Sequence, residues 1–317
     1  MGAAVKRNQF GVLLVLLLSA VCAFAADAKF SPDFTLPSKG DFKFVVYGDI
    51  RFTDPANVRP SNPEMRHALV SEIAKEKPQA VIITGDIVLR GDNPEDWKVF
   101  DQEATPLRDG ITLWPTLGNH DLYRDPQQGL AHYFARFPEL KDKRWYSARR
   151  GNVAFFLLDS ASDAQGGEEW QWLDRNLSAL PRNVNFVIIA MHHPPITHST
   201  ELTGHPARSS EQALGEMIEK HAASSKAKFV VLAGHVHNYE RYERGGVEYI
   251  VTGGGGATPY PIPRAPEDHY REAGPTYHFC RFTVQGRKLH MDMVKVEGDP
   301  QSPSFAVKDS FDLTAEK

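Results

Sequence analysis

Apolar runs along this chain repeatedly end in a polar or charged side chain. Five of these runs predict buried β-strands, and four of the five are rich in Val, Ile and Phe. In chain order they are FKFVVYGD, QAVIITGD, TLWPTLGNHD, NFVIIAMHH and KFVVLAGHVH. The side chains at their ends are Asp49, Asp86, Asn119 with His120, His192 with His193, and His235 with His237. The repeated arrangement is more informative than any one of these motifs alone.

Helical patterns separate the predicted strands. Apolar residues recur at helical spacing in three segments, residues 63–77, 168–180 and 210–222. Beyond residue 237 the patterns are strand-like only, at residues 247–251, 277–284 and 288–294. We therefore predict an α/β fold of four layers, an α-β-β-α sandwich in which helices flank two packed mixed sheets. The later strands are expected to form the second, more antiparallel sheet.

The amino-terminal residues have the pattern of a targeting signal. Lys6 and Arg7 precede an apolar stretch over residues 10–21 and an Ala-Phe-Ala sequence that ends at Ala25. We predict a signal peptide over residues 1–25 and a secreted or periplasmic protein. The stretch is shorter than the ~20 residues that span a bilayer, so no stable membrane insertion is expected after cleavage. An uncleaved membrane anchor is the alternative.

The rest of the chain predicts one large domain. Residues 26–40 are polar and contain prolines, which is typical of a linker. The domain is expected over residues 41–300, with a C-terminal extension or last strand over residues 301–317. The formal net charge is −4, so the chain lacks the basic surface that nucleic-acid binding requires. Signal cleavage would leave Cys280 as the lone cysteine, without a disulfide partner.

The polar residues directly follow the predicted strands, so the positions of the strand ends determine where these residues meet. In open α/β sheets, ligands bind beyond the carboxyl ends of the strands. The side chains expected at that edge are Asp49, Asp86, Asn119, His192, His235 and His237. Carboxylate, amide and imidazole groups bind Fe, Mn and Zn alike. Two such ions about 3.5–4 Å apart can activate a water molecule and stabilise an in-line phosphoryl displacement. The pattern therefore predicts a metal site for hydrolysis.

The order of these motifs resembles the calcineurin-like metallophosphoesterases. The segment GHVHNYER, residues 234–241, is similar to the GHxHxYER signature of the purple acid phosphatases, and VTGGGGA at residues 251–257 also resembles that branch. The resemblance covers roughly residues 42–257. It implies that Asp86 bridges two metal ions. Asn119, His192 and His235 would complete one site, and Asp49 and His237 would belong to the other.

The same resemblance implies roles in catalysis for two neighbouring residues. His120 would be the proton donor to the leaving group, a role that an imidazole fills well near neutral pH. Asp121 would orient His120. His193 is expected either to serve packing or to support the metal ligands without binding the metal itself. His198 and His205 lie in a loop after His192, where they are expected either to bind substrate or to face solvent.

Two positions depart from the family pattern. Most members carry a ligand His two residues after the first Asp, but this chain has Arg51 there. In the purple acid phosphatases a Tyr follows the bridging Asp by three residues, and here that residue is Leu89. A guanidinium cannot ligate a metal, but it can bind a phosphate oxygen. We therefore predict no purple colour and leave two arrangements open. One is a dinuclear site with a weakly held ion, which the presence of Asp49, Asp86 and His237 favours, and the other is a one-metal site.

These expectations define three candidate functions. The first is a secreted metal-dependent phosphoesterase that hydrolyses small phosphomonoesters by attack of a metal-bound hydroxide, with His120 as the leaving-group acid. The second is a phosphodiesterase acting on nucleotides or lipid head groups. The third is a phosphate-binding protein with a degraded metal site, which Arg51 favours and His120 disfavours.

Overall fold

The computed structural model describes residues 1–2, 30–161, 166–200, 205–272, 274–299 and 302–316. The predicted signal peptide, apart from its first two residues, and the start of the predicted linker lie outside the described residues. Within the described ranges, no helix is both long enough and apolar enough to span a bilayer.

One sheet, called sheet B here, contains six described strands in the order β13-β12-β11-β2-β3-β4. Its parallel half consists of β2 (Phe42–Tyr47), β3 (Ala80–Ile83) and β4 (Thr112–Pro115). Its antiparallel half consists of β11 (His278–Gln285), β12 (Lys288–Asp299) and β13 (Ser302–Thr314). The two halves join where β11 pairs with β2.

The other sheet, sheet A, contains seven described strands in the order β1-β5-β6-β7-β8-β10-β9. They are β1 (Phe34–Thr35), β5 (Tyr146–Arg150), β6 (Val153–Leu157), β7 (Phe186–Met191), β8 (Lys228–Ala233), β9 (Tyr239–Arg244) and β10 (Val247–Thr252). The central strands β6, β7, β8 and β10 are parallel, and antiparallel pairs flank them. Both sheets are therefore mixed, as predicted.

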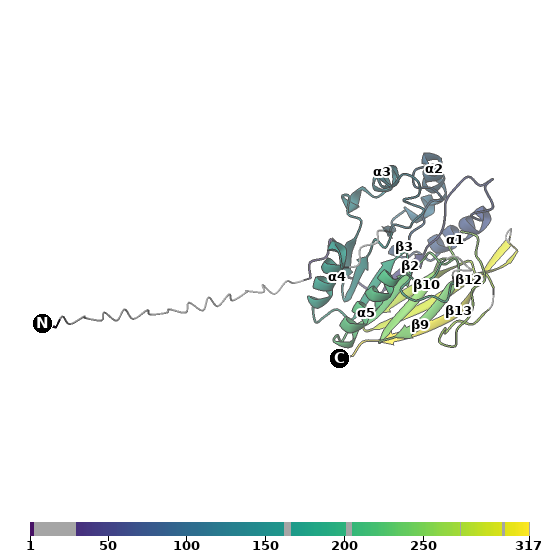
Figure 1. Ribbon diagram of the computed structural model, residues 1–317. Helices are drawn as coiled ribbons and strands as arrows, with labels where there is room; N and C mark the ends of the chain where they lie inside the picture. Colours follow the sequence, from purple (N-terminus) through teal and green to yellow (C-terminus); the bar gives the residue numbers. More distant parts are fainter. Residues whose placement is uncertain (3–29, 162–165, 201–204, 273, 300–301, 317) are drawn as a thin grey trace.

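The assignment of strands to sheets differs from the prediction. The apolar pattern predicts that all strands after residue 237 lie in a second sheet, but β10 pairs with β8 in sheet A and β11 pairs with β2 in sheet B. An apolar pattern identifies a strand without identifying its partner, and β2 and β11 lie at opposite ends of the domain sequence. The predicted α/β architecture of two packed mixed sheets with flanking helices is confirmed (Figure 1).

Alternating side chains on the sheet A strands bury two different faces. On β6, Val153, Phe155 and Leu157 belong to the core between the sheets, whereas Ala154 and Phe156 pack under the helices. Phe155 meets Phe44 of β2 with ring centroids 5.4 Å apart, which joins sheet A to sheet B. A strand buried on both faces explains why these runs are continuously apolar.

Helices cover the outer faces of the sheets. They are α1 (Pro63–Lys75), α2 (Pro94–Glu103), α3 (Pro126–Arg136), α4 (Glu168–Ser178) and α5 (Ser209–Ala223), with 3₁₀ turns η1 (Thr105–Leu107) and η2 (Pro138–Leu140). Apolar residues of α4 and α5 pack against sheet A. The first three helices each begin with Pro after a capping Asn62, Asn93 or Asp125. Helices α2 and α3 are not among those that apolar spacing predicts, although their Asn-Pro and Asp-Pro steps signal helix starts.

Candidate metal centre

The predicted strand-end residues meet at one edge of the two sheets. Asp49, Asp86 and Asn119 follow β2, β3 and β4 of sheet B, and His192 and His235 follow β7 and β8 of sheet A. Contacts cross between the sheets here: Nε2 of His192 lies 3.3 Å from Oδ1 of Asp86 and 3.0 Å from Oδ1 of Asn119. The sheets therefore contribute to a single cluster at the carboxyl ends of their strands.

Backbone strain is concentrated in this cluster. Asp49, Arg51, Asp86 and His235 have φ angles of 56°, 54°, 51° and 69°. Such left-handed conformations are uncommon outside glycine and cost ~1–3 kcal/mol each. Backbone hydrogen bonds hold them in place, including those donated by Asp49 N to the Gly85 carbonyl and by Arg51 N to the Asp86 carbonyl. The fold thus stabilises conformations that direct these side chains to one point.

His192 provides one test of whether the cluster fits a metal. Its Nδ1 lies 2.8 Å from the carbonyl oxygen of Thr84, which can only accept, so Nδ1 carries the hydrogen. Burial lowers the pKa of His192, so its Nε2 presents a lone pair. That lone pair faces oxygens of Asp86 and Asn119 and lies 3.2 Å from Nδ1 of His235. A bound cation would satisfy these converging acceptors, and the bond to Thr84 is one that metal-ligating histidines typically make.

The surroundings of His237 indicate that a second position in the cluster also fits a metal ion. Its Nδ1 donates to the Thr258 carbonyl at 2.9 Å, and its Nε2 is buried without a hydrogen-bond partner. That nitrogen lies 3.6 Å from Oδ1 of Asp49, which is also buried and unpartnered. Ligand atoms of Asp49, Asp86 and His237 lie within 4.8 Å of one another. Orphaned buried acceptors of this kind are costly, and a cation would satisfy both.

Asp86 connects the two positions. Its Oδ1 accepts from the backbone N of His120 at 2.9 Å and lies near His192. Its Oδ2 accepts from Nε and Nη2 of Arg51, at 3.3 and 3.2 Å. Burial alone would raise the pKa of Asp86. The neighbouring His192, His120 and Arg51 nevertheless hold that pKa well below its usual range. Asp86 is therefore a carboxylate with one oxygen toward each half of the cluster.

Arg51 occupies the side of the cluster where the second position lies. Its side chain is 12% exposed and lies against Asp86. Burial and Asp86 raise the pKa of Asp49, and the positive charge of Arg51 opposes that shift. Burial lowers the pKa of His237 well below its usual value, with Arg51 adding to the effect. The guanidinium is thus part of the electrostatics of the Asp49–His237 position.

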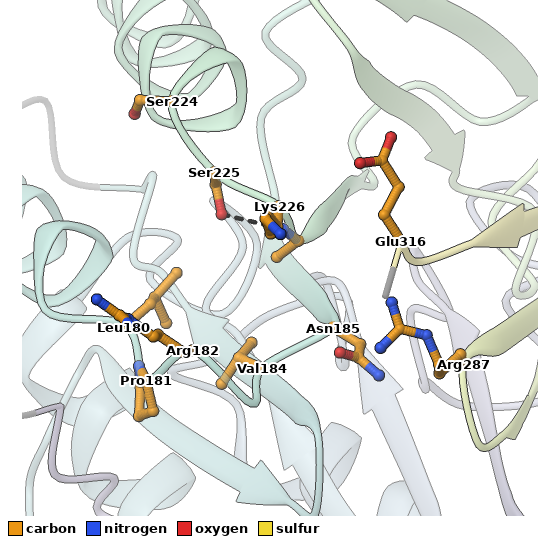
Figure 2. Close-up of a pocket in the computed structure, with 11 residues that line it drawn as sticks. Leu180, Pro181, Arg182, Val184, Asn185, Ser224, Ser225, Lys226, Arg287 and Glu316 are labelled. Carbon is orange, nitrogen blue, oxygen red and sulfur yellow. Dashed lines mark hydrogen bonds between the residues drawn. The ribbon is translucent and has the colours of Figure 1, made fainter.

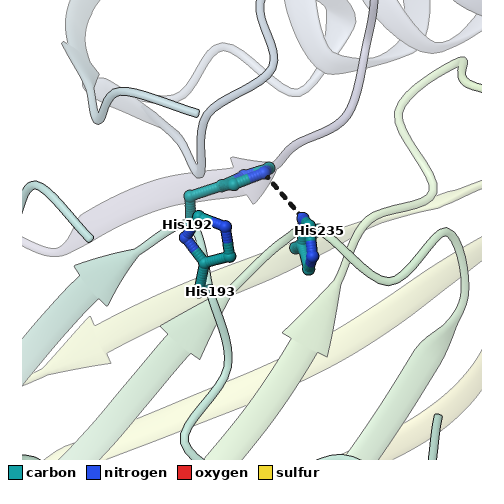
Figure 3. A group of neighbouring side chains, drawn as sticks. All are labelled: His192, His193 and His235. Carbon is teal, nitrogen blue, oxygen red and sulfur yellow. Dashed lines mark hydrogen bonds between the residues drawn. The ribbon is translucent and has the colours of Figure 1, made fainter. Parts of the chain in front are cut away.

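His193 lies beside the cluster, and its hydrogen bonds favour a packing role. Figure 3 shows its ring next to those of His192 and His235, and the ligand atoms of the three lie within 4.8 Å of one another. Ser160 Oγ accepts from the backbone N of both His192 and His193, at 3.0 and 2.8 Å. Its own hydrogen is therefore donated to Nδ1 of His193, 3.2 Å away. The other nitrogen of the neutral ring then carries a hydrogen and offers no lone pair.

The orientation of His120 differs from the sequence-based expectation. Its Nδ1 lies 2.7 Å from the Leu89 carbonyl oxygen, so Nδ1 donates there and Nε2 is left for proton transfer. The Asp121 carboxylate instead accepts from the backbone N of Ile87, Val88 and Gly118. Among the described hydrogen bonds, none joins Asp121 to the His120 ring. Asp121 fixes the loop after β3, and the Leu89 carbonyl orients the imidazole.

The two loop histidines lie in different surroundings. Nδ1 of His205 is 3.1 Å from Nε2 of His235, so His205 lies against the cluster. His198 bonds to the Tyr242 hydroxyl at 2.9 Å and lies 3.5 Å from Glu267. The described contacts of His198 therefore connect it to Tyr242 of β9 and to Glu267, and not to the predicted ligands.

The residues after the GHVH motif hold neighbouring segments in place. The buried Glu240 carboxylate accepts from Thr197 Oγ1, His198 N and the Tyr242 hydroxyl. Arg241 bonds to Asp309 of β13 at 2.6 and 3.1 Å. This network ties the loop after β7 to β9, and β9 to β13 of sheet B, which agrees with a structural role for these motif residues.

Several supporting groups had no clear signal in the sequence. The Thr84 and Leu89 carbonyls are backbone atoms that any residue supplies. Ser160 had a weak signal, because it follows the predicted strand at residues 153–158. Tyr123, whose ring lies 5.7 Å from that of His120 with an angle of 24° between their planes, lacked a recognisable motif.

A pocket of about 480 Å³ lies at the opposite end of the sheet A strands (Figure 2). Asn185 and Ala227 in its lining precede β7 and β8, whereas the metal-ligand candidates follow those strands. Arg182, Lys226, Arg287 and Glu316 also line it. The pocket is therefore separate from the metal centre.

Comparisons with known proteins show which family model and which relatives this chain matches. The family model for calcineurin-like phosphoesterases matches residues 42–239. Probable purple acid phosphatase 20 of Arabidopsis thaliana is 27% identical over 267 residues, covering 75% of this chain and 58% of that protein. A 3′,5′-cyclic-nucleotide phosphodiesterase of Nostoc sp. is 28% identical over 199 residues, covering 60% of this chain and 68% of that one.

A solved structure shares the fold of this chain. Purple acid phosphatase PPD1 from yellow lupin (Lupinus luteus) seeds has a similar structure, with a TM-score of 0.70 at 18% identity, covering 90% of this chain and 55% of that chain. This chain spans about half the length of the first curated purple acid phosphatases that it matches.

Proposed function

The chain belongs to the calcineurin-like phosphoesterase family, on its purple acid phosphatase-like branch, and from this we propose that it is a secreted metal-dependent hydrolase of phosphomonoesters. The observation that carries the proposal is the convergence of buried acceptors on two positions at the strand ends. Neutral imidazole nitrogens and carboxylate oxygens that converge on shared positions are the ligand set that a cation requires, and Nε2 of His237 and Oδ1 of Asp49 are buried there without hydrogen-bond partners.

Six side chains would hold the metal ions. Asn119, His192 and His235 would form one position, Asp49 and His237 the other, and Asp86 would bridge them. The donor set suits Fe, Mn or Zn. Bound ions would supply Lewis-acid activation of water and neutralisation of phosphate charge.

Arg51 would bind a phosphate oxygen of the substrate. Its guanidinium is held by Asp86 and remains 12% exposed, so a phosphate can reach it. Charge-assisted bonds of this type are worth ~1.5–3 kcal/mol. The arrangement with two ions is favoured over one ion plus Arg51, because Oδ1 of Asp49 and Nε2 of His237 would otherwise stay buried without partners.

His120 would transfer the proton to the leaving group. The Leu89 carbonyl holds Nδ1, so the imidazolium would give its Nε2 proton to the departing oxygen, and the ring would return to its neutral form. General acid catalysis of this type typically contributes 10²–10⁴-fold to the rate. His205, which lies against His235, would contact the substrate, whereas His198 bonds to Tyr242 of β9.

Two assays separate the candidate functions. Hydrolysis of p-nitrophenyl phosphate faster than of its bis-ester supports a phosphomonoesterase, and the reverse order supports the phosphodiesterase that the similarity to the Nostoc enzyme suggests. Metal-loaded protein that binds phosphate but hydrolyses neither ester supports the binding-protein alternative and refutes the proposal.

His120→Ala tests the assigned acid. It should lower kcat by about 10²–10⁴-fold on alkyl phosphates, which need protonation of the leaving oxygen. The loss should be smaller on p-nitrophenyl phosphate, whose leaving group is a weak base. Equal losses on both would remove the proton-donor role. His67→Ala, a change on the outer side of α1, serves as the control. Secretion is tested separately, by the mass of the mature protein in the extracellular or periplasmic fraction.

A further inference from the structure

An exposed aromatic ring lies directly beside the assigned acid. Tyr123 is 48% exposed, and it is the one aromatic residue among the exposed large hydrophobic side chains of the described ranges. Its ring centroid is 5.7 Å from that of His120, and the two planes are 24° apart. A nearly parallel, offset arrangement leaves much of the tyrosine ring open to solvent next to the imidazole.

The turn that carries Tyr123 is fixed by backbone hydrogen bonds. The His120 carbonyl accepts from Tyr123 N at 3.2 Å and from Gly91 N at 2.9 Å, and the Tyr123 carbonyl accepts from Asp125 N at 3.0 Å. Asp125 in turn caps α3. Arg124 adopts a left-handed φ of 67°, a strained conformation that the surrounding turn maintains. Tyr123 is therefore presented by a preorganised segment, which reduces the entropy lost when a ligand binds.

The orientation of His120 determines which of its nitrogens would face the leaving group. Because Nδ1 bonds to the Leu89 carbonyl, the departing oxygen must lie within hydrogen-bond distance of Nε2. The group attached to that oxygen would then lie near the His120 ring, with which the exposed Tyr123 ring is stacked. The guanidinium carbon of Arg124 lies 5.6 Å from the Tyr123 ring centroid, which adds positive charge to this side.

From this geometry we infer that Tyr123 is the binding surface for the leaving group, and that the site prefers phosphomonoesters whose leaving group carries a planar aromatic ring. This inference rests on the proposed phosphomonoesterase function. Offset aromatic pairs gain attraction beyond the area that they bury, and an alkyl leaving group lacks that gain. An aryl ester and a nucleotide share this chemistry, since both place a flat ring within reach of Tyr123.

Three substrates and three variants test the inference. The kcat/KM values of metal-loaded protein are measured on p-nitrophenyl phosphate, 5′-AMP and glycerol 3-phosphate. Tyr123→Ala should lower the preference for a ring-bearing substrate over glycerol 3-phosphate by about 2- to 10-fold, mainly through KM. Tyr123→Phe, which keeps the ring, should retain the preference. Val307→Ala, an exposed change on β13, should leave all three values at the wild-type level.

Each outcome of this comparison of kcat/KM values leads to a different conclusion about Tyr123. A loss confined to p-nitrophenyl phosphate identifies aryl esters as the class, and a loss confined to 5′-AMP identifies nucleotides. Equal losses on all three substrates, or no loss, would overturn the inference, because Tyr123 would then support His120 or do nothing. Wild-type protein that hydrolyses none of the three would instead refute the proposed function and remove the basis of the inference.

Discussion

Replacing Arg51 with His should exchange a phosphate-binding group for a metal ligand. In the present structure the guanidinium donates twice to Oδ2 of Asp86 and influences Asp49 and His237. Loss of its charge-assisted bonds to substrate, worth ~1.5–3 kcal/mol, should weaken phosphate binding by roughly 10- to 150-fold. An imidazole at this position would add a ligand to the group formed by Asp49, Asp86 and His237, so the second ion should be held more tightly.

Two measurements on the same samples follow both effects. Metal content after dialysis against a weak chelator reports retention of the second ion, and the inhibition constant of inorganic phosphate reports oxyanion binding. Arg51→Lys keeps the charge without the bidentate geometry, so it should lose part of the phosphate affinity and gain no metal. Arg59→His, at an exposed position, is the matched control. Unchanged metal retention together with unchanged phosphate inhibition in Arg51→His would refute the reasoning.

Three further predictions concern supporting residues and spectroscopy. Ser160→Ala removes the acceptor of two buried backbone N–H groups, so the free energy of unfolding in urea should fall by ~1–3 kcal/mol; no change would show that water replaces the hydroxyl. Burial raises the pKa of Glu169 to about 8. The free energy of unfolding that is linked to its protonated form is therefore fully present below pH 4.5, and it is lost as the pH rises to about 8. Glu169→Gln should therefore gain stability relative to wild type across that window, whereas the exposed Glu168→Gln should follow wild type, and parallel pH profiles for all three would contradict the assignment. Because Leu89 stands where a tyrosinate ligand would lie, iron-loaded protein should lack a strong visible charge-transfer band, and a purple protein would show that another tyrosine ligates the iron.

The polar residues at the strand ends could be predicted from sequence, because they depend only on which residue directly follows each apolar run. A buried run followed at once by a polar residue fixes both the strand and the end at which that residue lies. Asp49, Asp86, Asn119, His192 and His235 therefore occupy the expected edge. The pairing partner of each strand could not be predicted in this way, because β10 and β11 join different sheets through contacts between distant parts of the chain.

The orientation of individual side chains was harder to predict. A carboxylate next to a catalytic imidazole is a common arrangement, but Asp121 instead satisfies three backbone N–H groups. The groups that orient His120 and His192 are carbonyl oxygens of Leu89 and Thr84. Backbone acceptors have no signature in the sequence, because every residue supplies one, so only the fold reveals which carbonyl lies next to which ring.

Anomalous diffraction from crystals grown with Zn²⁺ or Mn²⁺ tests the central claim most directly. Two peaks are predicted, one among Asn119, His192, His235 and Asp86, and a second among Asp49, His237 and Asp86. A single peak at the first position would support the one-metal arrangement with Arg51. Absence of any peak at this edge of the sheets, under conditions in which the protein is active, would contradict the account.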